Sequence, residues 1–494
     1  MSPLLFAVVV DVLLRKLTLA MNGQGTVRAF ADDTAAVLDN LFGFLPTVAQ
    51  LFDEYAAISG LHLNYGKTVL VPLWRREERE YEEIDRMLAA IGGGWVQVLV
   101  RSMAKYLGFL VGPGRDDSIW DKPVTKWRLR ARGWQGTHVG LQYSALVYNV
   151  FCASVLYFIA QLEPIPVEVH AQEEATMLVL ASGPTAWANS SDLWRMGAQC
   201  GVGRSFHCIK ARGEASMLRA YYFENWERPI REEVARLATW ERTSCQIDRQ
   251  FFWRGWFERS YPRTLHRNQL VLAERGIRLQ DIRTKLCPGR NAAKDRAKLR
   301  AGFQREAARA NLQAYLETWE YRIDHKLVRW ELQGNRHRHR NLLINNLQRL
   351  GKLVPPRVAA ASWGLVWNRW CTARRFQGEA PCMLGCGRGK DSIEHYMGCR
   401  VGREAGGRML RLGGNYARRK QCLLGVIKFD DDSEQTCWAV LAYGLYMTTN
   451  ARRASRMQAR PLEEAVQEVM QHCRQAVEGD PRAKRCLSQR WAAR

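Results

Sequence analysis

The stretch Val27-Arg-Ala-Phe-Ala-Asp-Asp-Thr-Ala-Ala-Val-Leu38 decides the fold of the first part of the chain. Two adjacent carboxylates, Asp32 and Asp33, stand between short apolar runs, with Gly23 and Gly25 just upstream. The pattern predicts a strand, a tight turn and a second strand, with the acids at or beside the turn. Two neighbouring carboxylates repel each other, and a divalent cation, which prefers carboxylate oxygens, is the usual partner that stabilises such a pair. A solvated Asp-Asp turn is the alternative, because Asp favours turns for local reasons.

Helices are expected on both sides of this hairpin. The segment from Ser2 to about Leu19 has Ser2 at the N-cap position and Pro3 in the first turn, and its apolar character almost all round predicts a buried helix. Apolar residues recur at helical spacing over residues 45–58. The sequence then predicts an extended segment around residue 67, a charged helix at about 77–91, a strand at 96–100 and a hairpin at 105–112. This alternation of helices and strands indicates an α+β fold.

Four motifs in this part of the chain resemble those of the reverse transcriptases of non-LTR (LINE-type) retrotransposons, and they occur in the family's order. They are Ser2-Pro-Leu-Leu-Phe6, Phe30-Ala-Asp-Asp33, Ser59-Gly-Leu-His-Leu-Asn-Tyr-Gly-Lys-Thr68 and Lys105-Tyr-Leu-Gly-Phe-Leu-Val-Gly112. The resemblance implies an α+β fold with a truncated polymerase palm, followed by mostly helical regions. The implied domains are a partial palm at 1–115, a helical thumb at 116–230, a basic helical region at 231–350, a CCHC zinc-knuckle region at 351–400 and a helical tail at 401–494.

The resemblance also implies RNA-directed DNA polymerase activity. In that activity Asp32 and Asp33 hold Mg²⁺ or Mn²⁺, which activates a primer 3′-hydroxyl toward a dNTP, and Lys67 lies near the incoming triphosphate. The hairpin that positions the primer contains Lys105, Tyr106 and Gly108. The implied partners are an RNA template, a DNA primer or target and dNTPs, in the nucleus. No membrane and no obligate protein partner are predicted.

The family's first catalytic Asp stands in a motif of the form F-x-D-x-x-x-A-F-D, well upstream of the Asp-Asp hairpin. Only 31 residues precede Asp32, and the single acid among them, Asp11, lies in helical surroundings that match a later segment. We therefore expect a fragment without fingers and with an incomplete set of catalytic carboxylates. The alternatives are a non-catalytic RNA- or DNA-binding remnant, which would use the basic helical region and the zinc element, and a decaying reading frame without function.

The charge of the chain favours a polyanionic partner. The sequence has 73 Lys and Arg against 49 Asp and Glu, a formal net charge of +24, which is typical of nucleic-acid-binding proteins; an acidic membrane surface is the rival. Thirteen cysteines show no disulfide-framework spacing, and the N-terminal residues do not form a convincing signal peptide, so we expect reduced thiols in an intracellular protein. The apolar run at 145–160 falls short of the ~20 residues that span a bilayer, and it predicts a buried helix.

Two basic stretches are candidates for nucleic-acid contact. Arg128 and Arg130 lie in the run Trp127-Arg-Leu-Arg-Ala-Arg-Gly-Trp134, where guanidinium groups suit phosphates and indoles suit bases. A helical core that contains the Trp residues is the favoured interpretation of this run taken alone. The run Arg336-His-Arg-His-Arg340 predicts an exposed, partner-facing loop in which Arg336, Arg338 and Arg340 bind phosphates. His337 and His339 as metal ligands are the less favoured interpretation of that run.

The strongest metal-binding pattern is C-x3-C-x8-H-x3-C, formed by Cys382, Cys386, His395 and Cys399. Thiolates and an imidazole at such short spacing are the ligands of a closed, tetrahedral, structural zinc site. The LINE-type family also carries a CCHC element downstream of its polymerase. The short spacing before the last Cys leaves Cys371 open as an alternative fourth ligand, and a chance cluster of cysteines is the alternative to any metal site.

Overall fold

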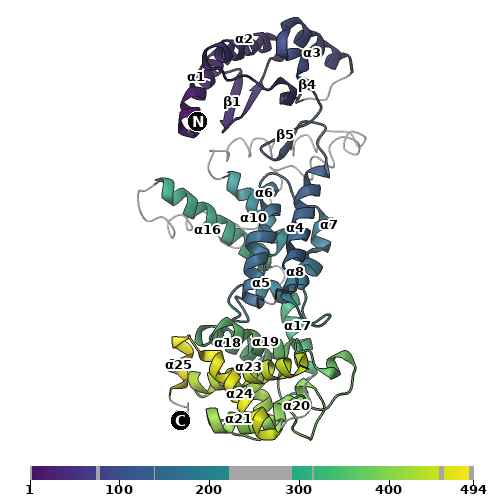
Figure 1. Ribbon diagram of the computed structural model, residues 1–494, viewed down its shortest axis with the longest axis vertical. Helices are drawn as coiled ribbons and strands as arrows, with labels where there is room; N and C mark the ends of the chain where they lie inside the picture. Colours follow the sequence, from purple (N-terminus) through teal and green to yellow (C-terminus); the bar gives the residue numbers. More distant parts are fainter. Residues whose placement is uncertain are drawn as a thin grey trace. The chain divides into compact units, whose positions relative to one another are not determined.

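The computed structural model describes residues 3–73, 78–137, 139–221, 292–313, 316–455 and 461–488 (Figure 1). The chain divides into two compact units, Met1–Lys122 and Pro123–Arg494. The described residues are mostly helical, and the first unit contributes the short strands, which agrees with the predicted α+β class. Much of the predicted basic region, residues 222–291, lies outside the described residues, as do the predicted N-cap Ser2 and the residues of the boundary near 230.

The first unit alternates helices with two-stranded ribbons. Its elements are α1 Pro3–Met21, β1 Gly25–Phe30, β2 Asp33–Leu38, α2 Leu41–Ser59, η1 Tyr65–Lys67, β3 Val69–Leu70, α3 Glu78–Ile91, η2 Gly93–Gln97, β4 Leu99–Val100, β5 Ala104–Tyr106, β6 Phe109–Val111 and η3 Asp117–Trp120. The pairs β1–β2 and β5–β6 are antiparallel, whereas β3 and β4 are parallel.

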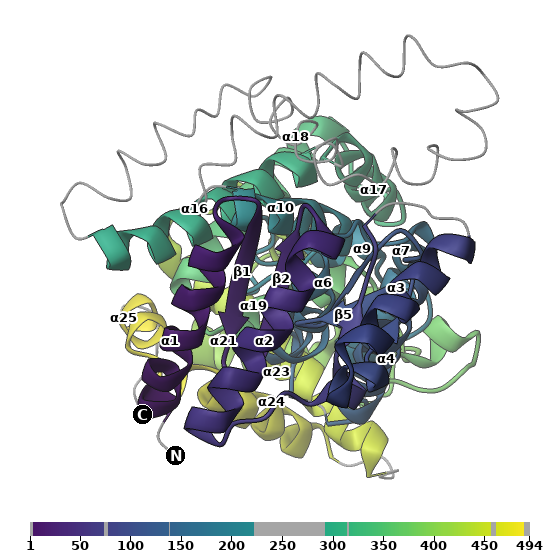
Figure 2. The ribbon, with the colours of Figure 1, turned by 90° about the horizontal axis from the view of Figure 1, so that it is seen from above.

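The predicted Asp-Asp hairpin is confirmed as a structural element. Strands β1 and β2 pair in a register that sets Phe30 opposite Asp33, so Ala31 and Asp32 form a two-residue turn. The helices α1 and α2 lie alongside the hairpin (Figure 2). The core of the unit joins these elements to α3 and η2 through buried Leu13, Leu17, Met21, Val27, Leu45, Val48, Ala49, Ile84, Leu88, Trp95 and Val98.

Helix α1 is buried on one face, which corrects the prediction of burial all round. Leu13 and Leu17 are buried against α2 and β1, but Leu4, Val12 and Leu19 are 78, 56 and 79% exposed. A single layer of neighbours covers only one side of a helix, so an apolar sequence alone does not decide burial.

The segment around Lys67 is only partly extended, which corrects a second prediction. The carbonyl of Asn64 accepts hydrogen bonds from the N–H groups of Lys67 and Thr68, both at 3.0 Å, and this closes a 3₁₀ turn before strand β3 begins. The predicted strand at 96–100 likewise begins as the 3₁₀ turn η2, because Gly92 and Gly93 both take positive φ angles, 77° and 59°, that bend the chain.

The regular elements among the described residues of the second unit are helices joined by loops, apart from one isolated bridge between Pro381 and Lys390. Its elements are α4 Asp121–Gly133, α5 Leu141–Val147, the π-helical turn η4 Tyr148–Cys152, α6 Ser154–Ile159, α7 Val167–Ala171, α8 Glu173–Ala181, α9 Ser190–Arg195, α10 Ile209–Tyr221, α16 Ala292–Gln313, α17 Leu316–Val328, α18 Arg336–Leu353, α19 Pro356–Val366, η6 Ala373–Phe376, α20 Ile393–Gly398, α21 Arg400–Leu410, α22 Tyr416–Leu424, α23 Asp432–Ala454, α24 Leu462–Val477 and α25 Pro481–Leu487.

The apolar run at 145–160 forms α5, η4 and α6 in the core of this unit. Ala145, Tyr148, Leu156 and Ala160 are fully buried there, as predicted. None of the helices among the described residues combines the length and the apolar character needed to cross a bilayer.

Helix α23 is the centre of the C-terminal part of the second unit. It packs against α18, α19, α21, α22, α24 and α25, and its residues from Ser433 to Ala442 are all buried. The helix begins at Asp431, whose side chain accepts a hydrogen bond from the Glu434 N–H at 2.6 Å. The buried indoles of Trp363, Trp367 and Trp370 fill the space beside it, so most of the hydrophobic stabilisation of this part comes from helix-on-helix contact.

Candidate functional site

Four side chains of the second unit converge on one point and can hold a metal ion. The ligand atoms of Cys382, Cys386, His395 and Cys399 all lie within 4.8 Å of one another. The Sγ atoms of Cys382 and Cys399 are 3.9 Å apart, and Cys386 Sγ is 3.2 Å from His395 Nε2. Cys371, the alternative ligand, is not part of this group, so Cys399 completes the set.

The spacing of these atoms fits zinc. A tetrahedral zinc ion with Zn–S bonds of about 2.3 Å holds its sulfur ligands about 3.8 Å apart, close to the separation of the Cys382 and Cys399 sulfurs. Three thiolates and one imidazole are a common structural zinc set, and Cys382 and Cys399 are buried, 6 and 0% exposed, while Cys386 and His395 are half-buried. We name residues 379–399, with this ligand set, the zinc module.

Local sequence brings the four ligands together. The N–H of Cys382 donates to the carbonyl of Gly389 at 2.8 Å, and Gly385, with φ at 69°, allows the tight turn between the first two cysteines. A Cβ atom on Gly389 would lie 2.2 Å from Nδ1 of His395, so only glycine allows the imidazole to approach. Ser392 caps α20 by accepting from the His395 N–H at 3.1 Å, which sets that ligand in the first turn of the helix.

The thiols of Cys382 and Cys399 shift each other's pKa in opposite directions. The sulfurs of Cys382 and Cys399 share a hydrogen bond, and this bond lowers the pKa of Cys382 and raises the pKa of Cys399. Two thiols at this distance cannot both ionise easily without a cation between them. A bound Zn²⁺ would remove that conflict, because it stabilises thiolates directly.

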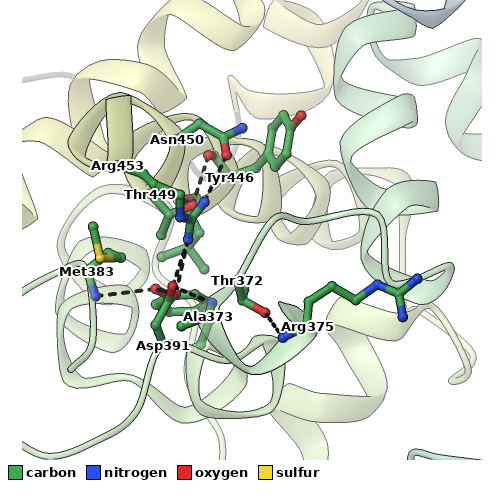
Figure 3. A network of polar contacts seen from close by, with 11 residues as sticks. Thr372, Ala373, Arg375, Met383, Asp391, Tyr446, Thr449, Asn450 and Arg453 are labelled. Atoms are coloured by element: carbon green, nitrogen blue, oxygen red, sulfur yellow. Dashed lines mark hydrogen bonds and ion pairs between the residues drawn. The ribbon is translucent and has the colours of Figure 1, made fainter. Parts of the chain in front are cut away.

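A buried polar network ties the zinc module to α23 (Figure 3). The carboxylate of Asp391, 2% exposed, accepts from Arg453 Nη2 at 3.0 and 3.1 Å, from the Ala373 N–H at 2.8 Å and from the Tyr396 hydroxyl at 2.5 Å. Tyr396 in turn accepts from the Met383 N–H at 3.3 Å. The network therefore joins the loop that carries the first cysteines, the helix that carries the histidine and the long central helix.

This network was not predicted from the sequence. Asp391 and Arg453 are 62 residues apart, and neither belongs to a recognisable motif. The only local signal is that Asp391 and Tyr396 lie within the predicted zinc region, where residues around metal ligands commonly orient them.

The predicted polymerase residues of the first unit lie on its surface. Asp32 and Asp33 are exposed at the turn of the β1–β2 hairpin, where Ala31 takes a left-handed φ of 54°. Lys67 is exposed on η1 and Lys105 on β5. Within the described ranges, the Cys382 cluster is the one group of three or more metal ligands, so neither Asp32 nor Asp33 has two further His, Cys, Asp or Glu ligands beside it.

The hairpin that carries Lys105 and Tyr106 has the predicted form. Strands β5 and β6 are joined by Leu107 and Gly108, whose φ angles of 47° and 92° are both positive. Two positive φ angles match the right-handed twist of a two-residue hairpin, and glycine adopts one without strain. Lys105 is exposed, whereas Tyr106 is half-buried.

The two arginines predicted to bind nucleic acid on α4, Arg128 and Arg130, are both half-buried. Trp127 is fully buried, so this indole belongs to the core, and Arg130 Nη1 donates to the carbonyl of Phe151 at 2.5 Å. Arg128 is half-buried, and its Nε has no hydrogen-bond partner. Trp134 stacks on Phe151 with ring centroids 6.2 Å apart.

The predicted loop at 336–340 is wrong, because these residues form the first turn of α18. Asn335 caps the helix by accepting from the Arg338 N–H at 3.2 Å. Arg336 and Arg338 are exposed as predicted, but Arg340 forms ion pairs with Asp324 at 2.6 Å and Glu320 at 3.5 Å. His337 and His339 belong to no metal-ligand group among the residues that the structure describes.

Comparison with known proteins adds no relative. No protein-family model, curated protein or solved structure matches this chain.

Proposed function

We propose that the chain is the C-terminal portion of a LINE-type retrotransposon reverse transcriptase, an RNA-directed DNA polymerase. The observation that carries the proposal is the order of its four motifs together with the elements on which three of them lie. The Asp32–Asp33 pair is at a hairpin turn, Ser59 ends a helix and Lys105 lies in the first strand of a second hairpin. In this function the partners are an RNA template, a DNA primer or target and dNTPs, and the site of action is the nucleus.

The hairpin does not by itself make a divalent-metal centre. Two metal ions that clamp a phosphoryl transfer need several oxygen ligands, and among the described residues Asp32 and Asp33 are not part of a group of three. Both carboxylates are exposed to solvent. Polymerase activity of this polypeptide would therefore require a further carboxylate beyond this pair, and we derive no catalytic step through Mg²⁺.

A second candidate function is nucleic-acid binding without catalysis. It is favoured by the contrast between the open Asp32–Asp33 turn and the complete ligand set of the zinc module. The net charge of +24 favours phosphate contact, and the exposed Arg336 and Arg338 at the start of α18 are available for it. In both functions the zinc is structural, since its four ligands come from the protein.

Primer extension distinguishes the two functions. The purified chain is incubated with an RNA template, a DNA primer, dNTPs and Mg²⁺ or Mn²⁺, beside the Asp32→Ala/Asp33→Ala variant. Extension by the parent protein that the variant lacks supports the polymerase. Salt-sensitive RNA binding without extension, equal in both proteins, supports the binding function, and the absence of both activities contradicts the proposal.

A further inference from the structure

Five cationic side chains from two distant segments meet beside the zinc module. Arg322, Lys326 and Arg329 follow one another at spacings of four and three residues, so they lie along one side of α17 and its C-terminal extension. Arg374 and Arg375 come from η6. We call these five side chains the cationic face.

The charges of this face act on one another. Burial and the positive charges of Arg322, Arg375 and Arg329 lower the pKa of Lys326 to about 8, and Asp192 opposes part of this shift. Such a shift means that the surroundings of Lys326 disfavour an additional positive charge. An anion placed there would relieve the repulsion.

The protein supplies too few anions to neutralise the face. Arg322 pairs with Asp192 at 2.6 Å, and Arg329 and Arg374 share the single carboxylate of Glu394. Lys326 and Arg375 donate instead to neutral carbonyl groups, those of Trp187 at 3.0 Å and Thr185 at 2.5 Å. Among the described contacts, five cations therefore meet two carboxylates, which leaves an excess of three positive charges.

One guanidinium of this face is open to a ligand, since the side chain of Arg374 is 68% exposed. The Nε of Arg375 has no hydrogen-bond partner among the described residues, but it is buried and does not face solvent. Figure 3 shows Arg375 extending away from the Asp391 network, so its guanidinium is not used to hold the zinc module.

Two exposed aromatic residues are sequence neighbours of the cations. Tyr321 is 77% exposed and precedes Arg322 on α17, and Phe376 is 61% exposed and follows Arg375 on η6. Large aromatic rings lose favourable burial when they face water, so two of them next to these cations in the sequence favour a partner with flat, stackable groups. Nucleobases on a phosphate backbone combine both properties.

We propose that the cationic face binds single-stranded nucleic acid, with Arg374, Arg375 and Lys326 on phosphates and with Tyr321 and Phe376 stacked on bases. The inference rests on the proposed function and names a surface that would carry it. A single strand is the fitting form, because its unpaired bases can leave their stack and lie on the protein rings. RNA and single-stranded DNA both offer these phosphates and unpaired bases.

The zinc module supports this face. Glu394, which holds Arg329 and Arg374, is the neighbour of the ligand His395 in α20. Zinc bound at His395 would fix α20 and with it the carboxylate that positions the two arginines. The metal would therefore order the surface without contacting the nucleic acid.

Fluorescence anisotropy with a labelled 20-nucleotide RNA, the matching single-stranded DNA and the matching duplex tests the inference. We expect Arg374→Gln/Arg375→Gln to weaken single-strand binding at least tenfold and to lower the slope of log K against log salt by about 1.5. Tyr321→Ala/Phe376→Ala should weaken binding at least fivefold with an unchanged salt slope. The control Arg482→Gln/Lys484→Gln removes the same charge from α25 and should bind as the parent does.

The outcomes separate this inference from the proposed function. If the parent chain binds neither strand, the proposed function fails and this inference fails with it. If the parent binds and both face variants bind equally well, the proposed function stands and this inference is overturned. Preference for the duplex, or binding to phosphatidylserine vesicles but not to RNA, would also overturn it. The rings removed in the second variant are exposed, so we expect it to fold as the parent does, and circular dichroism checks this.

Discussion

The Asp-Asp hairpin at residues 25–38 and the zinc module both carry a short motif of potential metal ligands, but their surroundings differ. The hairpin presents Asp32 and Asp33 to solvent at a two-residue turn. The zinc module buries Cys382 and Cys399, and Asp391 beside them receives four hydrogen bonds from three other segments. A ligand motif becomes a metal site when distant parts of the chain enclose it, and the second unit alone provides such an enclosure among the described residues.

Zinc removal should produce the largest effect. Structural zinc contributes about 10–16 kcal/mol in model zinc fingers, so we expect a chelator to lower the unfolding temperature of the second unit and to open residues 379–399 to proteolysis. Differential scanning calorimetry and limited proteolysis measure this. The same chelator should leave the unfolding temperature of the Cys386→Ser variant unchanged. If the chelator does not change the unfolding temperature of the parent protein either, the proposed difference between the Asp-Asp hairpin and the zinc module is contradicted.

Asp391→Asn should have the next largest effect. The substitution removes the buried carboxylate that pairs with Arg453, whose side chain is 28% exposed, and the loss of a partner in a buried pair costs up to about 3 kcal/mol of unfolding free energy. Urea denaturation measures the loss. The matched control is Glu379→Gln, which breaks the exposed ion pair with Lys390 in the same module and should change nothing measurable. Equal effects of the two substitutions would contradict the role of the buried network.

Glu173 is a buried carboxylate whose hydrogen-bond donors are neutral, in contrast to Asp391, which pairs with Arg453. Burial raises the pKa of Glu173 to about 8, against its ordinary 4.5, although the Ile209 N–H at 2.7 Å and the Trp194 indole at 3.2 Å donate to it. Between these pH values the folded state holds a proton that the unfolded state has lost, so the unfolding free energy falls as pH rises from about 4.5 to 8. Glu173→Gln should remove this fall and stabilise the protein by about 2 kcal/mol at pH 8.

Denaturation of both proteins at several pH values checks the effect of Glu173. The difference in unfolding free energy between Glu173→Gln and the parent should grow from pH 5 to pH 8 and then stay constant. A constant difference over the whole range would mean that Glu173 does not titrate in this window.

Asp32→Ala/Asp33→Ala should produce the smallest effect on stability. Both side chains are exposed, so we expect a change within about 0.5 kcal/mol in unfolding free energy. Thermal denaturation of the double variant measures it. A loss comparable to that of Asp391→Asn would show that the hairpin acids have partners that make them structural.

Local motifs predicted the elements of both regions, but not their environments. The hairpin around Asp32 and the turn at Leu107–Gly108 follow from short-range preferences, and so do the four zinc ligands. Whether a given face of α1 is covered depends on neighbours that the sequence pattern does not specify, so the exposure of Leu4 and Leu19 was missed. The composition of the run at 336–340 favours a loop and hides the capping role of Asn335, so it does not indicate the start of a helix.

Local sequence patterns predict the zinc module only in part as well. Cys382 to Cys399 lie within 18 residues of each other, so spacing alone could identify them. The partners that complete the environment, Arg453 for Asp391 and Arg329 for Glu394, come from helices far away in the sequence. Their pairing is a product of tertiary packing, and no local pattern signals it.

Native mass spectrometry of the purified chain tests the central claim most directly, since that claim is that the zinc module holds one structural metal ion. The account predicts one zinc per chain, lost in Cys386→Ser and kept in Cys486→Ser, whose thiol lies on α25 outside the ligand group. A parent chain without zinc, or a Cys386→Ser variant that retains it, would contradict the account.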